Sequence, residues 1–109
     1  MAIKTNLIID QGSDFSVIIN VTDSNSEPLN LQGYTGKSQM RKYFTSSTFY
    51  EFDVEVDDVN GLVSLSMESA ITNTIKPGRY VFDCELFSSA NVVSRIVEGI
   101  VTVTPGVTR

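Results

Sequence analysis

The sequence predicts an all-β fold, an antiparallel β-sandwich of seven to eight strands, and two observations carry this prediction. Bulky apolar residues alternate with polar ones in short runs, as half-buried strands require. Turn signals rich in Gly, Pro, Asn, Asp and Ser separate these runs every eight to twelve residues or so, and no long stretch has the helical period. With 109 residues and 41% hydrophobic side chains, we expect a single domain over 1–109.

The predicted strands follow one another through short connections. In chain order they cover residues 3–9, 15–22, 34–44, 50–56, 63–67, 79–87 and 92–103. Ile18 interrupts the polar face of the second strand, so we expect that face to be partly covered. Alternation in the third strand places Phe44 on the same inner face as Met40.

Turn residues mark the connections between these strands. The cluster at 23–28 turns the chain, and Asn60-Gly61 predicts a hairpin because this dipeptide suits a tight turn. One helical turn is expected between residues 68 and 75. The last strand changes phase near its middle, where Glu98-Gly99 predicts a β-bulge.

The stretch from 77 to 87 has the most specific pattern. Pro77-Gly78 predicts a tight turn, because Pro presets φ and Gly accepts positive φ. The inner face of the strand that follows carries Tyr80, Phe82, Cys84 and Leu86. A turn followed by Gly-x-Tyr is similar to the entry into strand F of immunoglobulin-like sandwiches, where the tyrosine hydroxyl bonds the preceding corner. We therefore predict an immunoglobulin-like sandwich with Tyr80 as its corner tyrosine.

Composition excludes several classes of function. The net charge is −5, so phosphate backbones and anionic lipids repel the chain, and we expect neither a nucleic acid nor a membrane partner. No apolar run reaches the ~18 residues of a membrane span. The N-terminus does not resemble a signal peptide, so synthesis in the cytoplasm is expected. One cysteine and no histidine exclude an internal disulfide and a Cys/His zinc site.

An acidic strand offers the first candidate site. Glu51, Asp53 and Glu55 share one face of a predicted strand, and residues two apart lie ~7 Å from each other, a spacing compatible with a glycosidase pair. Such a pair needs an enclosing cleft, for which this short chain has little material. A solvated outer face is the favoured interpretation, and no catalytic residue is predicted.

A turn offers the second candidate site. Asp57, Asp58 and Asn60 could present oxygen ligands to calcium. Their spacing does not match an EF-hand loop, and Asp-Asp before Asn-Gly is common in turns. We therefore predict no bound metal and no cofactor.

The third candidate is a protein interface on one hairpin. Tyr43 and Phe49 are expected to be exposed beside Arg41 and Lys42, while Tyr50 faces inward. Tyr, Phe and Arg are enriched in protein interfaces, so these four residues are the predicted contact site. Exposed aromatic rings could instead form a platform for a carbohydrate. The edges formed by the first and last strands are further candidates for pairing with a neighbour.

The order of these signals resembles a family of small immunoglobulin-like β-sandwich proteins in the tails and baseplates of tailed bacteriophages. The residues that carry the resemblance are 9–15, 27–34, 38–42, 61–65, 77–83, 98–103 and 108–109. The resemblance implies a non-enzymatic structural protein of the virion, made in the host cytoplasm. Its partners would be other virion proteins, and it would form a homo-oligomer in the particle. The alternative is a carbohydrate-binding or adhesin-type module on the same fold.

Overall fold

The structure is a computed structural model, and it describes residues 3–22, 25 and 27–107. In this part of the chain it is mainly β, with seven strands and one short helix. They are β1 (Ile3–Asp10), β2 (Phe15–Asn20), β3 (Thr35–Arg41), β4 (Tyr50–Asp57), β5 (Leu62–Met67), α1 (Ser69–Thr72), β6 (Gly78–Phe87) and β7 (Val93–Thr104). Every predicted strand and the predicted helical turn are present. No helix in the described part of the chain is long and apolar enough to cross a membrane. The predicted 23–28 turn and the 108–109 segment lie partly or wholly outside those residues.

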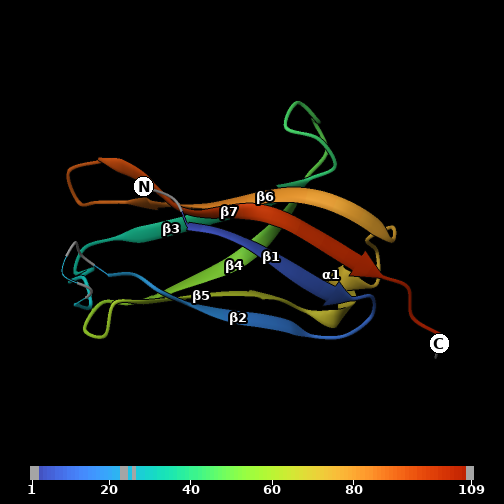
Figure 1. Cartoon of the computed structure of the whole chain (residues 1–109), viewed down its shortest axis with the longest axis horizontal. Coiled ribbons are helices and arrows are strands. Elements are labelled where there is room, and N and C mark those ends of the chain that lie inside the picture. The colour runs from blue at the N-terminus through green and yellow to red at the C-terminus, as the bar shows by residue number, and fades with distance from the viewer. Residues whose placement is uncertain (1–2, 23–24, 26, 108–109) are drawn as a thin grey trace.

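The strands form one hydrogen-bonded sheet in the order β1-β7-β6-β3-β4-β5-β2. Strand β4 joins two layers, because Tyr50 to Phe52 pair with β3 and Asp53 to Asp57 pair with β5. Figure 1 shows the sheet folded over on itself, so that β2 and β5 lie opposite the other strands. We call β1, β7, β6 and β3 the four-stranded layer, and β2, β5 and the second half of β4 the acidic layer.

The sheet is mixed, which corrects the prediction of antiparallel pairing throughout. Strand β1 pairs in parallel with β7, from Ile3 opposite Val97 to Asp10 opposite Thr104. The chain leaves β1 for β2 in the other layer, so β1 is free to pair with the last strand instead. The last strand is therefore interior, and the prediction that it forms a sheet edge was wrong: the edges are β1 and β2.

The predicted bulge in β7 is displaced. The register between β6 and β7 shifts so that Cys84 lies opposite Val97 and Glu85 opposite Arg95, which leaves Ile96 as the extra residue. Gly99 is regularly paired with Phe82, so it has a different role. A Cβ atom there would lie 1.6 Å from the carbonyl oxygen of Thr5 in β1, so glycine permits the close approach of β1 to β7.

The core lies between the two layers and is built mostly from the inward faces of the strands, with Leu31 added by the connection between β2 and β3. Its fully buried side chains include Ile9, Leu31, Met40, Val63, Leu65, Cys84, Leu86, Val97 and Val101. Phe52 joins the two layers, since its ring contacts both Phe15 and Phe82. The prediction that Phe44 lies inward was wrong: β3 ends at Arg41, and the chain turns before Phe44 can reach the core.

Tyr80 is a corner tyrosine, as predicted. Its hydroxyl donates a 2.6 Å hydrogen bond to the backbone carbonyl of Lys76, just before the turn that starts β6. The ring is buried and meets Tyr50 edge-on, with 6.3 Å between ring centroids. Burial raises the pKa of Tyr80 above its ordinary value, and Tyr50 adds to the shift. This bond fixes the entry of β6 relative to the core.

Candidate functional site

The loop between β3 and β4, residues 42–49, projects from the body of the molecule (Figure 1). We call it the aromatic loop, because Tyr43 is 67% exposed, Phe44 85% and Phe49 39%. A tight turn shapes its tip: the Ser46 N–H donates to the Tyr43 carbonyl, and the Ser46 hydroxyl accepts from the Tyr43 N–H, each at 3.0 Å. The turn holds the rings of Tyr43 and Phe44 outside the core.

Arg41 supports this loop from its base. One guanidinium nitrogen donates to the Ser46 carbonyl, and the other donates to Gln39 Oε1 at 2.9 Å. The guanidinium carbon also lies 4.6 Å from the centroid of the Phe49 ring. A planar guanidinium can make these contacts at once, whereas a lysine ammonium could not. These contacts therefore hold the aromatic loop in a defined conformation.

The four predicted interface residues do not form one patch. Arg41 and Phe49 contact each other, and Tyr43 points to solvent. Lys42 turns back, with its Nζ 5.2 Å from the centroid of the Tyr80 ring. Phe44, the most exposed ring of the loop, was missed because alternation was extended past the end of β3. The turn residues of the Thr-Ser-Ser sequence come only after Phe44, so no turn signal marks the end of β3 at Arg41.

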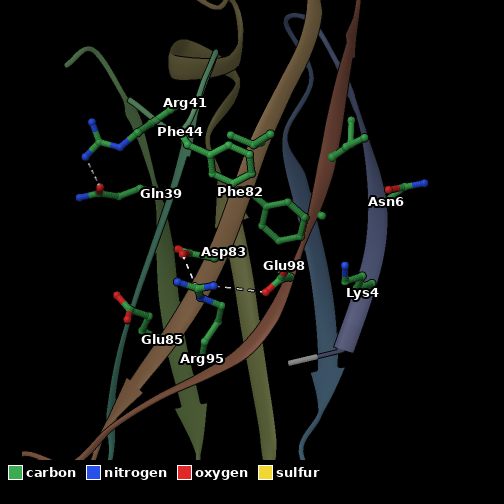
Figure 2. A pocket seen from close by; sticks show the side chains of 13 residues that line it. Lys4, Asn6, Gln39, Arg41, Phe44, Phe82, Asp83, Glu85, Arg95 and Glu98 are labelled. Carbon is green, nitrogen blue, oxygen red and sulfur yellow. Dashed lines mark hydrogen bonds and ion pairs between the residues drawn. The ribbon is translucent and has the colours of Figure 1, made fainter. Parts of the chain in front are cut away.

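The outer face of the four-stranded layer contains a hollow of about 550 Å³ beside this loop. Val81 and Ile100 lie opposite each other in the register of β6 and β7 and provide apolar surface. Phe44 lines the hollow from the aromatic loop (Figure 2). Phe82 and Gly99 also line it, and the remaining lining is polar or charged: Lys4, Asn6, Gln39, Arg41, Asp83, Glu85, Arg95 and Glu98.

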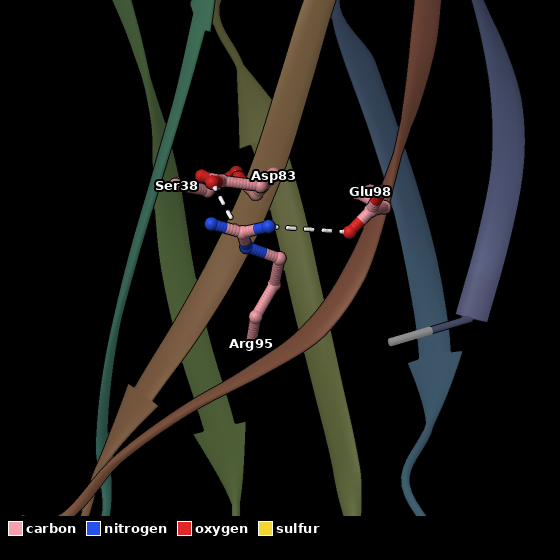
Figure 3. Close-up of polar contacts among 4 residues, drawn as sticks. All are labelled: Ser38, Asp83, Arg95 and Glu98. Atoms are coloured by element: carbon pink, nitrogen blue, oxygen red, sulfur yellow. Dashed lines mark hydrogen bonds and ion pairs between the residues drawn. The ribbon is translucent and has the colours of Figure 1, made fainter. Parts of the chain in front are cut away.

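Arg95 holds two carboxylates together in this hollow (Figure 3). Its Nε lies 3.4 Å from Asp83 Oδ2, and its Nη1 lies 3.3 Å from Glu98 Oε2. Asp83 and Glu98 are direct neighbours in the register of β6 and β7, so their charges would repel without Arg95. Below them the buried Ser38 hydroxyl donates a 2.6 Å hydrogen bond to the Asp83 carbonyl, which ties β3 to β6.

The two layers differ in charge. Neither 5–36 nor 43–75 contains a lysine or arginine, so β2, β4 and β5 have none. The strands of the four-stranded layer carry the basic side chains Lys4, Lys37, Arg41, Arg79 and Arg95. The acidic layer instead presents the carboxylates of β4. The fold thus gathers the basic strand residues in the four-stranded layer and leaves the acidic layer without any.

The carboxylates of the acidic strand are exposed, and Asp53 also lines a second hollow with Asp14 and Glu68. Glu51, Asp53 and Glu55 are all exposed on β4. Glu51 lies opposite β3, whereas the other two lie opposite Ser66 and Ser64 of β5, so the crossing of β4 between layers divides the group. None of the three lines the hollow beside the aromatic loop.

The acidic turn is explained by local hydrogen bonds. Asp57 Oδ1 accepts from the Asn60 N–H at 3.2 Å, and Asp57 Oδ2 accepts from the Asn60 side-chain amide at 3.0 Å. The side-chain bond, followed by the backbone bond, lowers the pKa of Asp57. Across the residues that the structure describes, no group of three or more Asp, Glu, His or Cys side chains is arranged to hold a metal ion.

Comparisons with known proteins show a similarity of fold only. No model of a protein family matches the chain, and no curated protein matches it. Among solved structures, it is similar to an internalin-like protein of Listeria monocytogenes, lmo2027, with a TM-score of 0.51, 15% identity, and coverage of 94% of this chain and 28% of that one. It is also similar to the R347E mutant of the SrpA adhesin of Streptococcus sanguinis, with a TM-score of 0.52, 13% identity, and coverage of 91% and 54%.

These similarities correct the expected kinship with phage tail and baseplate modules, which was wrong. The named proteins that share the fold are a bacterial internalin-like protein and a bacterial adhesin. The motifs that suggested a virion protein, such as Gln-Gly before a strand, occur in β-sandwiches generally because they satisfy turn geometry. The chain spans 28% and 54% of the lengths of the two proteins. Its fold is thus that of a module found within an internalin-like protein and an adhesin.

Proposed function

We propose that this chain is a non-enzymatic binding module of the adhesin type, and that it recognises a glycan through the aromatic loop and the adjoining hollow. The observation that carries the proposal is the position of Phe44. This ring is 85% exposed, yet it lines a hollow whose other surfaces include Val81 and Ile100. Covering a ring of this size is worth ~2 kcal/mol, which makes it a strong anchor for a ligand.

The composition of the hollow supports a glycan ligand. Apolar surface suits the C–H face of a sugar ring, and the side chains around it offer donors and acceptors for hydroxyl groups. Lys4, Asn6 and Gln39 are among these polar groups, and they project from β1 and β3 on either side of Val81 and Ile100. The similarity to an adhesin agrees with a binding role.

The available side chains give little support to catalysis. The chain has no histidine, so a Ser-His or Cys-His pair cannot form. Cys84 is buried in the core, where desolvation raises its pKa to about 12 and keeps the thiol protonated. The carboxylates of β4 face open solvent, which suits solubility better than general acid–base chemistry.

A glycan array tests the proposal directly. We expect the chain to bind a subset of glycans, and we expect Phe44→Ala and Tyr43→Ala each to weaken that binding at least about tenfold, since each removes one exposed ring of the aromatic loop. Val59→Ala is the matched control, because Val59 is also an exposed apolar side chain but lies in the turn between β4 and β5. Its binding should be unchanged.

Two results would count against the proposal. Failure to bind any glycan, together with failure of chain-coated beads to adhere to cells, would contradict an adhesin-type role. Glycan binding that survives both loop substitutions would place the site elsewhere.

A further inference from the structure

We propose that β2 is a self-association edge, along which two copies of the chain pair antiparallel about a two-fold axis at Ile18. This inference is independent of the glycan site, which lies on the other layer. Strand β2 is at one end of the strand order and, among the residues that the structure describes, pairs only with β5. Its second edge therefore presents backbone N–H and C=O groups that a further strand could use.

The backbone groups on this edge can be assigned. Val21, directly after β2, donates its N–H to the Gly61 carbonyl beyond the start of β5, at 2.8 Å. Backbone groups of successive residues alternate sides along an extended strand. The N–H and C=O groups of Ser16, Ile18 and Asn20 therefore point away from β5, toward the free edge.

Strand β2 lacks the features that usually protect an edge. The segment from Phe15 to Asn20 contains no charged residue, no proline and no glycine. Ile18, at its centre, is 61% exposed on the outer face. The other edge, β1, is different because it carries Lys4 and Asp10. Natural edges without such charges are normally covered, so an occupant is expected at β2 and not at β1.

The side chains on the inner face of β2 are also incompletely buried. Val17 and Ile19 pack against the core but are only partly buried. Their partners in β5, Leu65 and Val63, are completely buried. An added strand would remove the remaining apolar surface of β2 from water, which is favourable at ~25 cal/mol per Å².

The occupant that fits this edge is a second copy of the same strand. A two-fold axis perpendicular to the sheet places the inner face of one β2 in line with the inner face of the other. Residues that pair across the axis must therefore differ by an even number in the sequence, because side chains alternate faces along a strand. Centring the axis on Ile18 pairs Ile18 with its counterpart and Ser16 with Asn20. These three residues carry the free backbone groups, so both partners would satisfy each other's hydrogen bonds.

Charges do not oppose this arrangement. The segment that pairs, Phe15 to Asn20, carries no charged side chain. The acidic β4 strands would be five strand spacings apart, about 24 Å, well beyond the Debye length of about 8 Å at physiological salt.

Disulfide trapping of Ile18→Cys tests the predicted register. Hydrogen-bonded antiparallel neighbours have Cα atoms about 5.5 Å apart, within the disulfide range of about 4.4–6.8 Å. Native Cys84 is fully buried and should not compete. In a glutathione buffer we expect Ile18→Cys to form a covalent dimer. The matched control is Ile8→Cys on β1, where Ile8 is 67% exposed, and it should remain monomeric.

Sedimentation of the unsubstituted chain tests the association itself. We expect a concentration-dependent dimer whose dissociation constant rises at least about tenfold in Ile18→Lys, which sets two cations opposite each other. Ile8→Lys should sediment like the unsubstituted chain. Circular dichroism would confirm that both variants fold. A chain that stays monomeric at every concentration, or equal crosslinking of the cysteine variants at positions 8 and 18, would overturn the proposal.

Discussion

Asp83 and Glu98 face each other across β6 and β7, and the guanidinium of Arg95 lies between their carboxylates. Two like charges in direct register destabilise a sheet, so the arginine offsets a repulsion that the strand pairing creates. This arrangement also keeps charged groups at fixed positions in the hollow beside the aromatic loop. Its energetic value is limited because Arg95 is about half exposed.

We expect Arg95→Gln to lower the free energy of unfolding by ~0.5–1 kcal/mol at low salt. The loss should shrink in ~0.5 M salt, which screens the repulsion between Asp83 and Glu98. Urea unfolding at the two salt concentrations measures both values. Arg79→Gln, on the neighbouring strand β6 and outside this ion-paired group, is the control. A loss that does not change with salt would mean that Arg95 acts by packing instead.

Tyr80→Phe should lower the free energy of unfolding by ~1–2 kcal/mol, because it leaves the Lys76 carbonyl without its partner. For a domain of this size, each kcal/mol lowers Tm by ~4–8 °C. Calorimetry or thermal circular dichroism would record the shift. Tyr43→Phe removes an equivalent hydroxyl from an exposed ring and should leave Tm unchanged. Equal shifts in the two variants would contradict the corner role of Tyr80.

Gly99→Ala should lower the free energy of unfolding by more than ~3 kcal/mol, because the added Cβ would overlap the Thr5 carbonyl of β1. We expect β1 to separate from β7, and hydrogen exchange should show faster exchange of β1 amides than of β3 amides. Gly106→Ala is a milder control, because the nearest atom to its Cβ would be 3.1 Å away. Unchanged protection of β1 in the Gly99 variant would refute this account.

The buried Cys84 thiol should make the free energy of unfolding depend on pH in the alkaline range. Burial, with smaller contributions from Asp83 and Glu85, raises its pKa from 9.0 to about 12. The unfolded chain therefore loses this proton first as the pH rises. Stability from this group is complete below pH 9 and is lost between pH 9 and about 12.

By pH 10 the deprotonation of Cys84 in the unfolded chain should have lowered the free energy of unfolding by ~1 kcal/mol. Urea unfolding of the native chain and of Cys84→Ala at pH 8, 9 and 10 measures it. The alanine variant should be less stable at pH 8 because of the cavity, but its decline with pH should be smaller. Tyr80 contributes only above its ordinary pKa of 10.0, so the comparison below pH 10 isolates the thiol. Parallel pH profiles for the two proteins would contradict the assignment.

Local sequence patterns predicted much of the fold. Alternation located all seven described strands, and the turn at Pro77-Gly78 identified Tyr80 as the corner residue. These features depend on side-chain direction and turn geometry over a few residues, which the sequence displays directly. The candidate site was predicted less well. Arg41 and Phe49 were expected side by side and are in contact, whereas Phe44 was assigned to the core.

The sequence by itself determined which residues form strands and which of their faces are apolar, because a strand's period of two is a local property of the backbone. Only the tertiary structure decided that β1 pairs in parallel with β7, that Gly99 allows this contact, and that β2 is left as an edge. It also decided that Phe44 meets Val81 and Ile100 at one hollow. The physical reason is that strand pairing joins residues distant in the chain, and many pairings are compatible with the same local alternation.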